Sequence, residues 1–88
     1  MTPKFEFDPA KSMANKEKHG IDFISAQALW DDPGAIKIKA RTTDEDRYIV
    51  VGKIAGRYWT AIITCRNDHV RIISVRRARK KEVQAYEK

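Results

Sequence analysis

The chain has 88 residues, which is enough for one domain with a modest hydrophobic core. This length excludes a dinucleotide-binding Rossmann fold and a β/α barrel, because both need more chain. There are 18 Lys and Arg residues against 12 Asp and Glu, and the formal net charge is +6. Such a surplus favours a polyanionic partner, with nucleic acid as the first candidate.

The first half of the chain predicts one short strand and one helix before Gly20. Residues 5–7 alternate as a strand does. Asp8 and Pro9 are suited to the N-cap and the first position of a helix that ends at residue 18 or 19, just before Gly20. The predicted apolar side of this helix consists of Ala10, Met13 and Ala14. Its polar stripe at helical spacing consists of Lys11, Asn15, Lys18 and His19.

A second, shorter helix is expected after Asp22, which is its predicted N-cap. Residues 31–34 end it, because they contain a Pro-Gly pair. Its apolar stripe consists of Phe23, Ala26, Leu29 and Trp30.

From residue 35 the hydrophobic period changes to two, which predicts strands over residues 36–41, 47–54, 57–65 and 70–75. A polar loop at 42–46 and tight turns at 55–56 and 66–69 join them, and residues 78–87 are helix-forming. Consecutive strands joined by tight turns form an antiparallel meander. We therefore predict one α+β domain over residues 1–88, with an antiparallel β-sheet, two N-terminal helices and a C-terminal helix packed on one face.

The positive charge is concentrated late in the chain. Residues 1–44 carry equal numbers of basic and acidic side chains, so the whole surplus lies in residues 45–88. Five of the seven basic residues between positions 66 and 81 are arginine, whose planar guanidinium group suits phosphate. We expect an anion-binding surface in this segment.

The cysteine content and the hydropathy pattern indicate a cytoplasmic protein. Cys65 is the single cysteine, so no internal disulfide forms, as in proteins of a reducing compartment. No apolar run approaches the ~18–20 residues of a membrane span. The first residues lack the apolar stretch of a signal peptide. We therefore expect no contact with a membrane.

The residue types available for chemistry are Arg, Lys, His and Tyr. Two histidines and one cysteine do not form a metal-ligand pattern, and no phosphate-binding glycine loop is present, so we expect no metal and no cofactor. The available set can bind RNA, and it can also cleave RNA without a metal. In that reaction the 2′-hydroxyl attacks the neighbouring phosphorus, and fixed cations stabilise the charge on the phosphate oxygens.

Two blocks of the chain resemble the BrnT family of toxins. The first holds Phe5-Glu6-Phe7-Asp8, Lys11, Asn15 and the run at 18–21, followed by Phe23 and Ala26. The second holds Arg47-Tyr48 and Gly52, then the run at 71–78 with Glu82 and Tyr86.

The resemblance implies a RelE-like fold and a ribonuclease that inhibits translation, as the toxin half of a bacterial type II toxin–antitoxin pair. It also implies a ribbon-helix-helix antitoxin of the BrnA kind. Promoter DNA is then bound only through the antitoxin complex.

With this resemblance, the candidate site residues fall into two groups. The expected catalytic residues are His19, Arg66, Arg76, Arg77 and Tyr86. The expected RNA-binding residues are Lys11, Asn15, Lys18, Lys53, Arg79 and Lys80. Alternation sends Arg76 and Arg77 to opposite faces if the last strand extends that far, so that one contacts RNA while the other pairs with an acid such as Glu82.

Two other interpretations remain open. A double-stranded RNA-binding module also has helix, strands and helix in this order, with a lysine-rich start to its last helix. A protein-binding component would use the basic face for an acidic partner. The general base is not identified by the sequence. Tyr58 and Trp59 are expected to point to opposite faces of one strand, where at least one belongs to the core.

Overall fold

The computed structural model of the protein describes residues 4–40, 46–66 and 68–88. The elements in chain order are β1 (Lys4–Glu6), α1 (Pro9–His19), α2 (Phe23–Ala26), the 3-10 helix η1 (Gln27–Asp31), β2 (Ile36–Ala40), β3 (Arg47–Ile54), β4 (Arg57–Arg66), β5 (His69–Arg77) and α3 (Lys80–Tyr86). The predicted order is confirmed, with the second helix divided into an α-helical and a 3-10 part. Most of the predicted loop at 42–46, and residue 67 of the predicted turn, lie outside the described residues.

The ends of α1 follow the predicted capping chemistry. Asp8 accepts a hydrogen bond from the backbone N–H of Ala10 at 2.9 Å. Gly20 has φ 85° and closes the helix with a hydrogen bond from its N–H to the carbonyl of Lys16 at 2.8 Å. This left-handed conformation favours glycine, which explains why the helix stops there.

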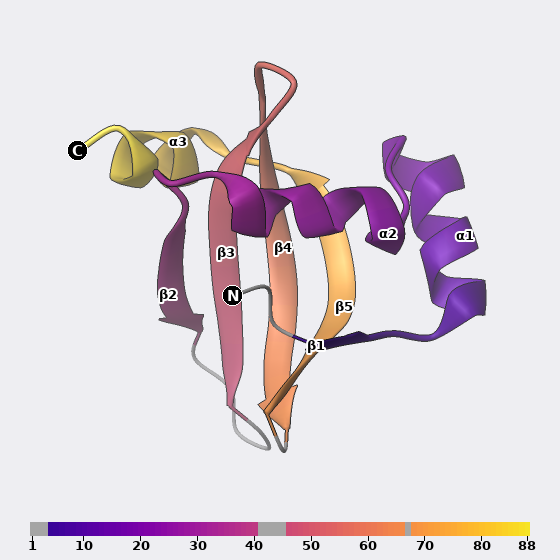
Figure 1. The fold of residues 1–88 in the computed structure, drawn as a ribbon. Coiled ribbons are helices and arrows are strands. Elements are labelled where there is room, and N and C mark those ends of the chain that lie inside the picture. The colour runs from indigo at the N-terminus through magenta and orange to yellow at the C-terminus, as the bar shows by residue number, and fades with distance from the viewer. Residues whose placement is uncertain (1–3, 41–45, 67) are drawn as a thin grey trace.

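The five strands form one sheet in the order β1-β5-β4-β3-β2. Strands β2 to β5 are the predicted antiparallel meander, whereas β1 pairs with β5 in parallel. The prediction of a wholly antiparallel sheet is therefore wrong at this edge. The reason is the helical segment between β1 and β2, which crosses the sheet and separates these two strands to opposite edges (Figure 1).

Alternation along the strands gives the sheet a covered face and an open face. The covered face packs against α2 and η1. Together they form the core, which consists of Ile21, Phe23, Ala26, Leu29, Val50, Trp59, Ala61, Ile63, Val70, Ile72 and Val75. The open face carries the alternate positions, among them Ile49, Ile62 and Ile38, and Ile38 is 40% exposed.

The prediction that all helices pack on one face is wrong for α3. Thr60 and Arg76 are cross-strand partners on the open face, and Glu82 of α3 is hydrogen-bonded to both. Helix α3 therefore lies on the open-face side, at the end of the sheet where β5 finishes (Figure 1). This end of the sheet carries most of the candidate site.

Helix α1 presents polar residues to the protein interior. Its buried residues are Ser12 and Asn15, whereas Met13 on the predicted apolar side is 71% exposed. The Ser12 hydroxyl accepts a hydrogen bond from the N–H of Phe23 at 2.9 Å. The Asn15 amide donates to the carbonyl of Ile21 at 2.8 Å, and its oxygen accepts from the N–H of Val75 at 3.2 Å. The predicted orientation of α1 is therefore wrong, because these side chains satisfy buried backbone groups.

The role of Asn15 predicts a large loss of stability on truncation. Asn15→Ala should lower the free energy of unfolding by roughly 2–4 kcal/mol, because it leaves a buried N–H and a buried carbonyl without a partner. Urea denaturation measures this difference. Met13→Ala is the control from the same helix, and it should stay within about 0.5 kcal/mol of the wild type. A larger loss for Met13→Ala than for Asn15→Ala would contradict the observed orientation.

Candidate active site

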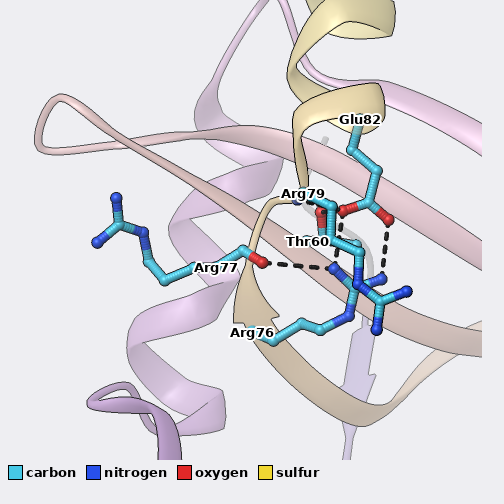
Figure 2. A network of polar contacts seen from close by, with 5 residues as sticks. All are labelled: Thr60, Arg76, Arg77, Arg79 and Glu82. Carbon is cyan, nitrogen blue, oxygen red and sulfur yellow. Dashed lines mark hydrogen bonds and ion pairs between the residues drawn. The ribbon is translucent and has the colours of Figure 1, made fainter.

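Helix α3 is attached to the sheet by the carboxylate of Glu82. This group accepts two hydrogen bonds from the Arg76 guanidinium, at 2.7 and 2.8 Å, in a bidentate pair. It also accepts from the Thr60 hydroxyl at 2.9 Å and from the backbone N–H of Arg79 at 2.7 Å (Figure 2). The Arg76 and Glu82 side chains are only 18% and 14% exposed, so water competes little for the pair.

The pair shifts the ionisation of both partners. The pKa of Glu82 is lowered from 4.5 to about 2, mainly because Arg76 donates to its charged form, with burial acting in the opposite direction. The same hydrogen bonds raise the pKa of Arg76. A carboxylate whose pKa is lower in the folded than in the unfolded protein stabilises the folded state at any pH above the unfolded pKa. This stabilisation is lost as the pH falls through the pKa of the folded state. For Glu82 this window extends from about 4.5 down to about 2.

Glu82→Gln should therefore change both the stability and its pH dependence. Near neutral pH the free energy of unfolding should fall by roughly 3 kcal/mol, because Arg76 loses its charged partner in a largely buried place. The wild type should lose stability as the pH falls from about 4.5 to about 2, and the variant should lack most of this loss. Denaturation at a series of pH values tests both points. An identical acid dependence in the two proteins would disprove the assignment.

One lysine and two tyrosines lie beside this pair, and we call Lys53, Tyr58 and Tyr86 the Lys–Tyr cluster. Lys53 and Tyr58 are cross-strand partners, and the Lys53 ammonium lies 5.0 Å from the centre of the Tyr58 ring. The Tyr58 ring meets the Tyr86 ring edge to face, with 5.4 Å between their centres. The Tyr58 hydroxyl donates to the Glu87 carboxylate at 2.9 Å. The cluster thus joins β3, β4 and the end of α3.

Asp32, which follows η1, holds Tyr86 in place. Its carboxylate accepts from the Tyr86 hydroxyl at 2.9 Å and from the backbone N–H of Lys53 at 2.8 Å. The backbone hydrogen bond from Lys53 is the main reason why the pKa of Asp32 is lowered. The hydrogen bond to Asp32 in turn raises the pKa of Tyr86, so this phenol stays protonated. A Cβ at Gly34 would lie 2.8 Å from the Tyr86 hydroxyl, so the ring position needs glycine there.

The two adjacent arginines of β5 have different surroundings, as alternation predicts. Arg76 is the partner of Glu82. Arg77 is exposed on the other side of the strand, and its guanidinium carbon lies 5.4 Å from the centre of the Trp59 ring. Figure 2 shows Arg77 pointing away from the Glu82 network. Arg77 therefore keeps its donors at the surface, whereas Arg76 uses most of its donors within the protein.

The structure brings only part of the predicted site together. Arg76 and the backbone of Arg79 belong to the Glu82 network, Lys53 and Tyr86 belong to the adjoining Lys–Tyr cluster, and Lys80 begins α3. Arg77 lies on the opposite side of β5. Arg66 is the register partner of His69, whereas Arg77 is the partner of Trp59. These two positions on β5 are eight residues apart, so roughly 25 Å separates the two ends. Arg66 therefore lies at the other end of the sheet from the Lys–Tyr cluster.

The predicted residues of α1 lie along a helix that packs against β5. Lys11 and Lys18 are exposed, and His19 is half-buried at the last helical position. Asn15 is buried, and both ends of its amide are hydrogen-bonded to the backbone. We therefore leave Asn15 out of the proposed RNA contacts.

Sequence reasoning missed two carboxylates of the site. The sequence pattern assigns Asp32 only to the end of a helix, and it assigns no role to Glu87. Tyr58 was considered only as one of two neighbouring aromatic residues, and the structure shows that Trp59 is the buried one. Nothing in the local pattern marks Asp32, because its partner Tyr86 lies 54 residues further along the chain.

Within residues 4–40, 46–66 and 68–88, no three or more His, Cys, Asp or Glu side chains gather closely enough to hold a metal ion. Across the same ranges, no helix has the length and apolar character needed to cross a membrane.

The fold and these side chains define a small basic α+β protein with guanidinium, ammonium and phenol groups gathered at one end of a sheet. Such groups are suited to a phosphate backbone and to the faces of unpaired bases. A family model described as the ribonuclease toxin BrnT of type II toxin–antitoxin systems matches residues 7–82, so the chain belongs to the BrnT family. This membership implies an antitoxin partner and an RNA substrate. No curated protein matches the chain.

Proposed function

We propose that this BrnT protein is a metal-independent endoribonuclease with a RelE-like fold, formed as one domain over residues 1–88. It acts in the cytoplasm, cleaves RNA and thereby inhibits translation. A ribbon-helix-helix antitoxin of the BrnA kind neutralises it, and the complex binds promoter DNA through the antitoxin. The observation that supports this most is the family match combined with the position of the Lys–Tyr cluster beside a fixed arginine.

The proposed reaction is an internal transesterification at the Lys–Tyr cluster. The 2′-oxygen of the ribose forms a bond to the adjacent phosphorus and loses its proton, and the bond from phosphorus to the 5′-oxygen breaks. The leaving 5′-oxygen takes up a proton, and the upstream fragment ends in a 2′,3′-cyclic phosphate. No co-reactant is needed, because the nucleophile belongs to the substrate.

The side chains have different roles in this proposal. Lys53 contacts the reacting phosphate, because its ammonium is exposed and held over the Tyr58 ring. Tyr86 has a raised pKa and donates its hydroxyl proton to Asp32, so in this proposal it holds the Tyr58 ring in place and transfers no proton itself. Arg76 is a positioning residue that holds α3 through Glu82. Arg79 and Lys80 supply surface donors for neighbouring phosphates, and Arg77 offers its donors on the opposite side of β5.

The first test of the reaction uses the RNA itself. The purified protein should cleave single-stranded RNA equally well with and without EDTA and release a 2′,3′-cyclic phosphate. A matched strand with one 2′-deoxyribose should resist cleavage at that position. Cleavage of the all-deoxy strand, or loss of activity in EDTA, would contradict the mechanism. Gel analysis and mass spectrometry of the products give the readout.

A second prediction compares Lys53 with Lys37, another lysine of the sheet whose ammonium lies over a tyrosine ring. Lys53→Gln should slow RNA cleavage by roughly tenfold or more, because it removes a cation from the reacting phosphate. The free energy of unfolding should change by no more than about 1 kcal/mol. Lys37→Gln is the control, because Lys37 is also an exposed strand lysine, with its ammonium 4.3 Å from the centre of the Tyr48 ring. Equal activity of the two variants would argue against the site.

The neutralisation partner is tested in cells. Expression of the chain alone should arrest bacterial growth with decay of RNA, and co-expression of the adjacent ribbon-helix-helix gene should restore growth. Normal growth with folded protein would argue against a toxin.

A further inference from the structure

We propose that a groove between α1 and α2 binds the antitoxin of this protein through an amphipathic helix, whose apolar side chains enter the groove and whose carboxylates face a lysine of α1. We call this surface the α1–α2 groove, and its lining includes Phe7, Pro9, Met13, Lys16, Asp22 and Ile24. This inference rests on the antitoxin partner of the proposed function, which family membership implies, and it does not depend on the reaction.

Helix α1 turns its apolar side to the solvent. Ala10, Met13 and Ala14 share one side of the helix, and all three are exposed. The buried residues of the helix are Ser12 and Asn15, although an amphipathic helix normally buries its apolar side. Because hydrogen bonds of Ser12 and Asn15 attach the helix to its neighbours, the apolar side remains accessible to a partner.

The exposed apolar side chains of the two helices meet at the groove. Among residues 4–40, 46–66 and 68–88, the large hydrophobic residues that are exposed are Met13, Ile24 and Ile38, at 71%, 67% and 40%. Met13 and Ile24 come from different helices and line the same groove, which has a volume of about 330 Å³ and also contains the half-buried Phe7. Apolar side chains that gather in this way mark an interaction surface, whereas a single exposed one such as Ile38 is ordinary.

The charges of α1 favour an acidic partner over a second copy of this chain. The exposed charged residues of this helix are Lys11, Lys16, Glu17 and Lys18. Two copies of such a helix packed together would bring like charges close, which costs free energy. Lys16 lines the groove, so a carboxylate of the partner can pair with its ammonium there. The charge of the groove is therefore complementary to an acidic amphipathic segment.

A small-molecule ligand fits the groove less well than a protein segment does. Pockets for small molecules contain a few polar groups that are aimed at the ligand. In this groove the Ser12 hydroxyl accepts a hydrogen bond from the N–H of Phe23 at 2.9 Å, and the Asp22 carboxylate accepts one from the N–H of Ser25 at 2.6 Å. Both acceptors are thus used within the protein. A mostly apolar groove of this kind suits the apolar anchors of a partner helix.

The groove lies far from the Lys–Tyr cluster. Figure 1 shows α1 and α3 on opposite sides of the molecule. Helix α1 packs against β5, whereas the cluster joins β3, β4 and the end of α3. A segment bound in the groove therefore does not contact the cluster itself. Substitutions in the groove should weaken neutralisation by the antitoxin and leave RNA cleavage unchanged.

The test measures binding of the purified protein encoded by the gene next to that of this chain, by isothermal titration calorimetry. Met13→Ala and Ile24→Ala should each weaken its binding by roughly tenfold, because each removes an apolar anchor. Ile38→Ala is the matched control, since it truncates an exposed apolar side chain outside the groove, and its affinity should stay within about twofold of the wild type.

The charge of the groove is tested in the same way. Lys16→Gln should weaken binding by roughly threefold at low salt. Lys18→Gln is its control, because Lys18 lies on a different side of α1, and it should weaken binding less. An equal loss in the two lysine variants would contradict the assigned position of the carboxylate.

Unchanged affinity in both Met13→Ala and Ile24→Ala would overturn the proposal, as would a wild type that does not bind the neighbouring protein. A dimer of the wild type that Met13→Ala dissociates in size-exclusion chromatography would assign the groove to a second copy instead. RNA cleavage separates this proposal from the proposed function. If the binding results hold and no variant or wild type cleaves RNA, the proposed reaction fails and the groove stands. If RNA is cleaved and the groove variants bind normally, the reaction stands and the groove fails.

Discussion

The position of helix α3 depends on the bidentate ion pair between Arg76 and Glu82. The structure describes all of Lys80–Tyr86, and none of these residues is buried. Val83, Ala85 and Tyr86 are half-buried, and the polar contacts of Glu82 determine where the helix begins. Tyr86 lies one turn further along, and its contact with Asp32 fixes the other end. Directional hydrogen bonds thus hold both ends of this helix, in addition to the non-directional packing of its half-buried side chains.

The two faces of the sheet differ in how far they are covered by helices. The covered face contains the core and the helices that close it. The open face carries the alternate residues of the same strands. Val51 and Thr60 are buried there, whereas Ile38 and Lys53 are exposed, so only substitutions at exposed positions of this face leave the interior unchanged. Polar contacts also hold α1 in place, because Ser12 and Asn15 form hydrogen bonds with backbone groups that lie outside their own helix. The protein therefore attaches α1 through buried polar contacts, because the buried residues of this helix are polar.

Much of the fold could be predicted from the sequence, because the strands alternate regularly and the helix starts carry strong capping residues. The opposite surroundings of Arg76 and Arg77 also follow from strand alternation alone. The face of α1 could not be predicted in this way, since Ser12 and Asn15 are polar and their partners are the backbone of residues 21, 23 and 75. A helical wheel records the polarity of side chains and contains no information on distant backbone groups.

The candidate site was predicted only in part for a related reason. Charge density along the chain grouped Arg66 with Arg77, although a hairpin of two long strands sends them to opposite ends of the sheet. The lengths of the predicted strands already imply that Arg66 and Arg77 lie far apart. The role of Asp32 was beyond reach, because it depends on the tertiary contact with Tyr86. Local patterns thus predict faces and caps well, and they predict the composition of a site less well.

The parallel pairing of β1 with β5 also determines when the fold can be completed during synthesis of the chain. Glu6 meets its register partner Arg71 only after 65 further residues have been added, which takes roughly 3–13 s at ~5–20 residues per second. Helix α1 also reaches its final contacts late, because the Asn15 oxygen accepts a hydrogen bond from the N–H of Val75. A nascent chain therefore has neither a finished sheet nor a seated first helix until its last strand has left the ribosome. The fold of this toxin is therefore completed only when nearly all of its chain has been made.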